Sequence, residues 1–173
     1  MSTPTPTGQH AARDDRDLVV FERTFSAPAE DVWAAVTESD RLARWIGTWS
    51  GDPTEGWIRF AMNAEGDDVP DERYDILACE APRLLAVRSE DQFGVWELEL
   101  EIVSRDGGTV LTLTQTVLDR TTVENTGPGW EYYLDRLVAA ETGGDVASID
   151  FDDYYPAMQA YYQALADRIP APE

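Results

Sequence analysis

The order of segments along this chain of 173 residues predicts an α+β fold. A strand-like run over 18–25 leads into a helical segment over 28–37, and Arg44 and Trp45 follow closely. Further strand-like runs come next, and the segment 127–130 (GPGW) then opens a second, longer helix. This order predicts a helix-grip domain, in which a curved antiparallel sheet wraps around one long C-terminal helix and leaves a cavity between them. The length suits one such domain with a sizeable core.

The first strand and the short helices after it carry clear local signals. The run 18–25 is β-branched or aromatic at most positions. Ser26 is expected to cap the next helix, with Pro28 in its first turn. The apolar stripe of that helix comprises Val32, Trp33 and Val36. A second short helix is expected over 41–46, so that the pair closes one end of the curved sheet.

The other strands of the sheet are expected over 48–50, 56–63, 72–80, 84–89, 94–104 and 109–118. The run 94–104 alternates most clearly, because Glu97, Glu99 and Glu101 separate apolar residues at every second position. That alternation indicates a half-buried antiparallel strand. Because three glutamates on one face do not fit a core, the convex face of the sheet is expected to meet solvent.

Two helices are expected after the last strand. The longer helix covers 123–141 and stops at Gly143. Its apolar stripe predicts that this is the helix held by the sheet. A further helix is expected over 154–169. The chain is therefore divided into a helix-grip domain over 18–144 and a C-terminal helical extension over 145–173.

The N-terminal residues, 1–17, are polar and contain Pro4, Pro6 and Gly8. This composition predicts a flexible tail. The segment lacks the apolar stretch of a secretory signal, so the expected location is cytoplasmic.

The charge balance excludes several kinds of partner. The formal net charge is -21, from 34 acidic and 13 basic residues, and every basic residue is an arginine. Nucleic-acid binding requires clustered cations, and anionic lipid surfaces repel an acidic protein. No apolar run approaches the ~18 residues of a membrane-spanning helix. We therefore expect no nucleic-acid partner and no membrane partner.

Missing residue types narrow the chemistry. Without lysine, the chain cannot form a Schiff base or supply a P-loop lysine. The single histidine, His10, lies in the N-terminal segment, so no histidine-dependent triad or zinc site is expected within the domain. The single cysteine, Cys79, lies in a strand-like run, which predicts a buried and inert thiol. We therefore expect no cofactor, no metal and no catalytic residue of these types.

Several short segments carry a family resemblance: 27–33 (APAEDVW), Arg44-Trp45, Gly56, 81–84 (APRL), 109–115 (TVLTLTQ), and Gly129-Trp130 with Leu134 and Leu137. Together they span about 18–141, and the sequence resembles the SRPBCC (START and birch-pollen-allergen-like) superfamily. Within it, the sequence is most similar to the family named for the activator of heat-shock protein 90 ATPase homologue 1. The resemblance implies a helix-grip fold with a hydrophobic cavity. It implies no common reaction, and a chaperone partner only weakly.

The candidate site consists of residues expected to face that cavity: Trp45, Trp57, Trp96, Gln115, Trp130, Tyr133 and Leu137. For the tryptophans, the alternative is that they fill the core. For the amide of Gln115, the alternatives are a hydrogen bond to a neighbouring group and a contact with a ligand. Arg23 shares a strand face with two phenylalanines, and pairing with a carboxylate is favoured over binding an acidic ligand.

Three hypotheses about function follow. The leading one is a module that binds a small hydrophobic or aromatic ligand, which requires an apolar cavity. The second is a cyclase- or dehydratase-like enzyme that moves protons with Tyr133, Gln115 and a buried carboxylate or arginine. It requires a titratable group with a shifted pKa inside the cavity. The third is a co-chaperone-like interaction domain, which requires a filled core and an exposed apolar patch. A homodimer remains open under each hypothesis.

Overall fold

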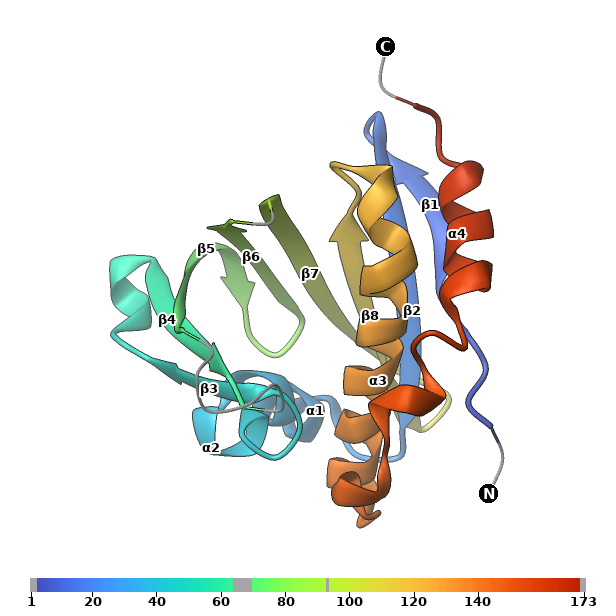
Figure 1. The fold of residues 1–173 in the computed structure, drawn as a ribbon. Coiled ribbons are helices and arrows are strands. Elements are labelled where there is room, and N and C mark those ends of the chain that lie inside the picture. Colours follow the sequence, from blue (N-terminus) through green and yellow to red (C-terminus); the bar gives the residue numbers. More distant parts are fainter. Residues whose placement is uncertain (1–2, 64–69, 93, 172–173) are drawn as a thin grey trace.

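The computed structural model describes residues 3–63, 70–92 and 94–171 (Figure 1). Its strands form one antiparallel sheet in the order β1-β2-β8-β7-β6-β5-β4-β3. The strands are β1 (Gln9–Arg13), β2 (Arg16–Phe25), β3 (Gly47–Ser50), β4 (Trp57–Met62), β5 (Glu72–Glu80), β6 (Leu84–Asp91), β7 (Gly94–Arg105) and β8 (Gly108–Thr116). The α-helices are α1 (Ala29–Thr37), α2 (Ser39–Leu42), α3 (Val123–Thr142) and α4 (Gln159–Asp167).

The sheet curves around the helices, which confirms the predicted helix-grip fold. In Figure 1, α3 lies across the part of the sheet that contains β2 and β8, while α1 and α2 lie at one end. The helix α4 packs against α3, on the side of the molecule where β1 forms the edge of the sheet. Within the described ranges, none of the helices is both long and apolar enough to cross a membrane.

The N-terminal segment is not a loose tail, and that prediction was wrong. Residues of β1 pair with β2 from Gln9 opposite Val20 to Arg13 opposite Arg16. Asp14 and Asp15 form the connection, and both have positive φ angles, 52° and 62°. Two residues of this kind allow the tight hairpin turn that matches the twist of the flanking strands. Turn chemistry therefore outweighed the polar composition of the segment.

Helix boundaries differ from expectation where proline is present. The N-cap of α1 is Pro28 and not Ser26, and α1 has no side-chain cap. The last helix begins at Gln159 and not at 154. Pro156 disfavours the helical conformation at the preceding residue, which delays the start of α4. The long helix α3 ends next to Gly143, whose φ of 77° is the left-handed conformation expected of a C-terminal stop.

The two faces of the sheet have opposite character. On the outer face, Glu97 and Glu99 of β7 form ion pairs with Arg16 and Arg13, at 3.1 Å and 3.2 Å. The inner face and the helices share a core whose fully buried members include Phe21, Val32, Leu111, Leu134, Leu137 and Tyr162. This division confirms the alternation predicted for 94–104 and leaves the inner face to build the candidate site.

Candidate functional site

A cavity of about 330 Å³ lies between the inner face of the sheet and helices α1 and α3. Its volume falls near the lower end of the ~300–1,000 Å³ typical of small-molecule sites. The sheet side is lined by Trp49, Ile58, Phe60, Met62, Tyr74, Ile76, Cys79, Leu85, Val87, Leu98, Leu100 and Leu113. The other side is lined by Trp33, Val36, Thr37, Leu42, Trp45, Ile46, Trp130 and Leu134. Pro53, which begins a short 3-10 helix, and Ala81, in a turn, complete the lining.

Hydrogen bonds hold three of the lining tryptophans in place. The indole Nε1 of Trp45 donates to the carbonyl of Ala35 at 3.0 Å. Trp49 donates to the carbonyl of Thr37 at 2.7 Å, at the end of α1. Trp130 donates to the amide oxygen Oε1 of Gln115 at 2.8 Å. Because these polar atoms are engaged by the protein, the rings form fixed apolar walls.

A β-bulge shapes the sheet side of the cavity. Ile76 pairs with Val87, whereas Cys79 pairs with Leu85, because the register shifts between Ile76 and Ala78. A bulge inserts one extra residue into a strand and redirects its side chains. As a result, Ile76 and Cys79 both line the cavity although they are three residues apart. Leu77, between them, is 58% exposed.

Cys79 is exposed, so the prediction that its thiol is buried was wrong. The residue lines the cavity together with Pro53 and Ala81, which are also exposed. These three residues are the exposed members of the described lining, so the cavity meets solvent beside them. The chain's single thiol therefore lies at the cavity entrance.

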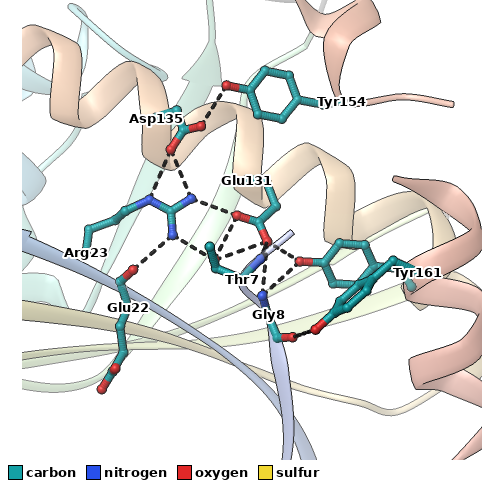
Figure 2. A network of polar contacts seen from close by, with 9 residues as sticks. Thr7, Gly8, Glu22, Arg23, Glu131, Asp135, Tyr154 and Tyr161 are labelled. Carbon is teal, nitrogen blue, oxygen red and sulfur yellow. Dashed lines mark hydrogen bonds and ion pairs between the residues drawn. The ribbon is translucent and has the colours of Figure 1, made fainter. Parts of the chain in front are cut away.

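A polar cluster gathers around two carboxylates of α3 (Figure 2), and these carboxylates are outside the described cavity lining. Glu131 follows the lining residue Trp130, and its side chain is 1% exposed. Its carboxylate accepts hydrogen bonds from the backbone N–H of Gly8 at 3.0 Å and from Nη2 of Arg23 at 2.7 Å. The hydroxyl groups of Thr7 and Tyr162 also donate to it. Glu131 is thus a shared acceptor for segments far apart in the sequence.

The same cluster extends along α3 to Asp135. The guanidinium of Arg23 donates from Nε to Asp135 at 3.1 Å, and the Tyr154 hydroxyl donates to the same carboxylate at 2.7 Å. The Tyr161 hydroxyl donates to the carbonyl of Gly8 at 2.7 Å. The pairing of Arg23 with carboxylates is therefore confirmed. We call these residues the terminal network: Thr7, Gly8, Arg23, Glu131, Asp135, Tyr154, Tyr161 and Tyr162.

Titration in the terminal network follows from its contacts. Burial by itself raises the pKa of Glu131, but hydrogen bonds from Tyr162 and Thr7 and the charge of Arg23 outweigh it, so the pKa is lowered. Burial, followed by the charge of Glu131, raises the pKa of Tyr162 far above its ordinary value. Burial and the hydrogen bond to Asp135 raise the pKa of Tyr154 in the same way. The network therefore favours a charged Glu131 carboxylate together with neutral phenols at Tyr154 and Tyr162.

Comparison with known proteins assigns the family. The model for Activator of Hsp90 ATPase homolog 1-like protein matches residues 26–141. The chain belongs to this family. The resemblance to the SRPBCC superfamily is thereby confirmed, and no curated protein matches the chain.

Solved structures show the same fold as this family member. CalU16 from Micromonospora echinospora has 23% identity and a TM-score of 0.73, covering 94% of this chain and 98% of its own. A Bordetella parapertussis protein, encoded by gene BPP1335, has 24% identity and a TM-score of 0.66, covering 100% and 97%. DynU16, a protein of the dynemicin biosynthetic locus, has 20% identity and a TM-score of 0.57, covering 75% and 49%. Structural similarity at these levels of sequence identity shows that the fold is shared.

Some of the residues proposed from sequence line the cavity, and others lie outside its described lining. Trp45 and Trp130 lie in the cavity wall of this family member, and Gln115 lies behind Trp130 as its hydrogen-bond acceptor. Tyr133 and Leu137 are core residues on α3, outside the described lining. The ring of Tyr133 lies 6.5 Å from that of Trp130, so it supports the wall from the side.

Trp57 and Trp96 are also outside the described lining, which corrects their assignment to the cavity. Trp57 alternates with the lining residue Ile58 on β4, so it faces the other way, and the guanidinium of Arg73 lies 4.6 Å from its ring centre. Trp96 lies near the start of β7, where its indole donates to Asp91 at 3.0 Å. Trp57 is outside the lining because of the alternation along β4, and Trp96 because of its position near the start of β7.

Several lining residues were not among the sequence candidates. Trp33 belonged to the apolar stripe predicted for the first helix, and Phe60 lies in β4, where Ile58, Phe60 and Met62 alternate on the inner face. That alternation was a readable signal. The placement of Ile76 and Cys79 was not, because it depends on a bulge created by pairing with another strand.

Proposed function

We propose that this domain binds a small apolar or aromatic molecule in the cavity between the sheet and the helices. The observation that carries the proposal is a cavity of about 330 Å³ with aromatic walls. Removal of apolar ligand surface from water drives such binding. Because Trp45, Trp49 and Trp130 are already fixed by hydrogen bonds, little ordering of the walls accompanies binding.

The electrostatics of the cavity favour binding over proton-transfer catalysis. Glu131, Tyr154 and Tyr162 have shifted pKa values, and all three belong to the terminal network outside the described lining. The amide oxygen of Gln115 is engaged by Trp130, so it supports a structural role. Within the described ranges, no group of three histidine, cysteine or acidic side chains is arranged to hold a metal ion.

An interaction domain has less support. The large apolar residues that are exposed among those described, Leu77, Val103, Leu118 and Phe151, lie on four different segments of the chain. DynU16 shares the fold and comes from a biosynthetic locus, which supports a small-molecule role by analogy of fold alone.

The proposal is tested with N-phenyl-1-naphthylamine, an uncharged probe that fluoresces in apolar surroundings. We expect saturable binding to the purified protein. Ile76→Trp places a large ring in the cavity, and we expect it to weaken binding by about tenfold or more. Leu77→Trp adds the same ring at the neighbouring exposed position and serves as the matched control.

Two outcomes would contradict the proposal. One is the absence of saturable binding to the unmodified protein. The other is equal affinity in the Ile76→Trp and Leu77→Trp variants, provided that thermal unfolding shows both to be folded.

A further inference from the structure

The described lining of the cavity contains no positively charged side chain. All 13 basic residues are arginines within the described ranges, and none of them lines the cavity. Nine of these arginines form ion pairs with carboxylates among the described residues. An anionic ligand would therefore find no arginine in the wall, and most arginines elsewhere are already paired.

One exposed lining residue has a charged carboxylate next to it in the chain. Asp52 precedes the exposed lining residue Pro53. Glu80, between Cys79 and Ala81, forms an ion pair with Arg83 and is therefore already neutralised. Hydrogen bonds from the hydroxyl and the backbone N–H of Thr54 lower the pKa of Asp52, so Asp52 is charged at neutral pH. The head group of an anion left near Pro53 would meet the charge of Asp52.

Burial in an apolar cavity and the negative charge of the whole protein both disfavour the binding of an anion. An anion that enters an apolar cavity loses its hydration, and only a paired or hydrogen-bonded charge recovers that loss. The formal net charge of -21 also repels an approaching anion. An uncharged molecule of the same shape experiences neither effect, while it gains the same contacts with the aromatic walls.

We propose that the cavity selects ligands by charge: it admits uncharged aromatic molecules and excludes organic anions built on the same rings. This inference rests on the proposed function and specifies the class of ligand. It predicts discrimination between molecules that share a ring skeleton and differ only in an ionised group.

The first test compares N-phenyl-1-naphthylamine with 8-anilino-1-naphthalenesulfonate at neutral pH. The two probes share one skeleton, and only the second carries a sulfonate. We expect the uncharged probe to bind at least about tenfold more tightly. Added salt should narrow the difference by screening the repulsion. Equal affinities would overturn charge selection and leave the proposed function intact, whereas no binding of the uncharged probe would contradict the proposed function itself.

A pair of variants separates charge from size. Cys79→Arg places a cation at the cavity entrance, whereas Leu77→Arg places the same cation on β5 outside the described lining. Both variants change the net charge equally. We expect Cys79→Arg to increase affinity for the sulfonate by several-fold and to change affinity for the uncharged probe by less than about twofold.

We expect Leu77→Arg to leave both affinities near those of the unmodified protein. If Cys79→Arg gains no affinity for the sulfonate while it still binds the uncharged probe, the sulfonate is excluded by its bulk and charge selection is overturned. The retained binding of the uncharged probe also shows that the variant is folded.

Discussion

Gln115 and Trp130 show how one side-chain pair links the core to the cavity. Gln115 is a buried amide on β8, and its oxygen accepts the indole N–H of a ring in the cavity wall at 2.8 Å. The alternation of residues along the strand predicted that Gln115 lies on the inner face, but it did not predict the hydrogen-bond partner of Gln115. The partner lies on α3, and no local pattern identifies which α3 side chain reaches β8.

Replacement of Gln115 by Leu should leave the Trp130 indole N–H without its acceptor. We expect the free energy of unfolding to fall by about 1–3 kcal/mol, and affinity for N-phenyl-1-naphthylamine to fall as the ring loses its anchor. Urea titration measures the first effect and fluorescence the second. Trp130→Phe, alone and combined with Gln115→Leu, completes a double-mutant cycle. Strict additivity in that cycle would show that the hydrogen bond contributes nothing.

Glu131 provides the clearest contrast between a buried and an exposed carboxylate. Glu131→Gln removes the charge that faces Arg23 inside the terminal network, and we expect it to lower the free energy of unfolding by about 3 kcal/mol. Glu99→Gln makes the same chemical change in an outer-face ion pair with Arg13, where we expect less than about 1 kcal/mol. Urea titrations at neutral pH compare the two. A loss at Glu131 no larger than that at Glu99 would contradict the role given to the network.

The pH dependence of Glu131 has a definite sign. Its pKa in the folded protein is lower than its ordinary value of 4.5, so its stabilising contribution is complete above that value. The contribution is lost as pH falls below 4.5 through the lower, folded-state pKa. Glu131→Gln should therefore flatten this part of the stability profile, as measured by urea titration at a series of acidic pH values. An unchanged slope in the variant would show that other carboxylates account for the acid sensitivity.

At the scale of elements, local patterns predicted the regular strands well. The alternation over 94–104 corresponds to β7, and the expected range 72–80 coincides with β5. The bulge within β5 was not predictable, because it exists only through pairing with β6. The hairpin that forms β1 had a local signal in Asp14-Asp15, which the polar composition of the surrounding segment concealed.

β1 and the residues before it act as a structural element of the domain. Removal of residues 1–13 should take away β1 and the donors Thr7 and Gly8, leaving Glu131 with fewer partners. We expect a lower thermal unfolding midpoint and weaker probe binding, because α3 carries both Glu131 and the lining residue Trp130. Removal of residues 1–5 leaves β1 and both donors in place and is the control. Equal midpoints for the two truncations would contradict a structural role for β1.

Across the whole molecule, the terminal network and the cavity occupy neighbouring parts of α3. Trp130 and Leu134 line the cavity. Glu131 and Asp135 accept hydrogen bonds from Arg23, and Gly8 and Tyr154 donate to Glu131 and Asp135 respectively (Figure 2). The fold class was predictable because it depends on the order of elements. The network was not, because Gly8 and Tyr162 meet across almost the entire sequence.

The central claim is that a small uncharged molecule occupies the cavity. Nuclear Overhauser effects between N-phenyl-1-naphthylamine and methyl groups of the 19.3 kDa protein test it most directly. We expect contacts to Ile76, Leu98 and Leu100, which line the cavity. Contacts only to exposed Leu77, Val103 or Leu118 would place the probe on the surface and contradict the claim.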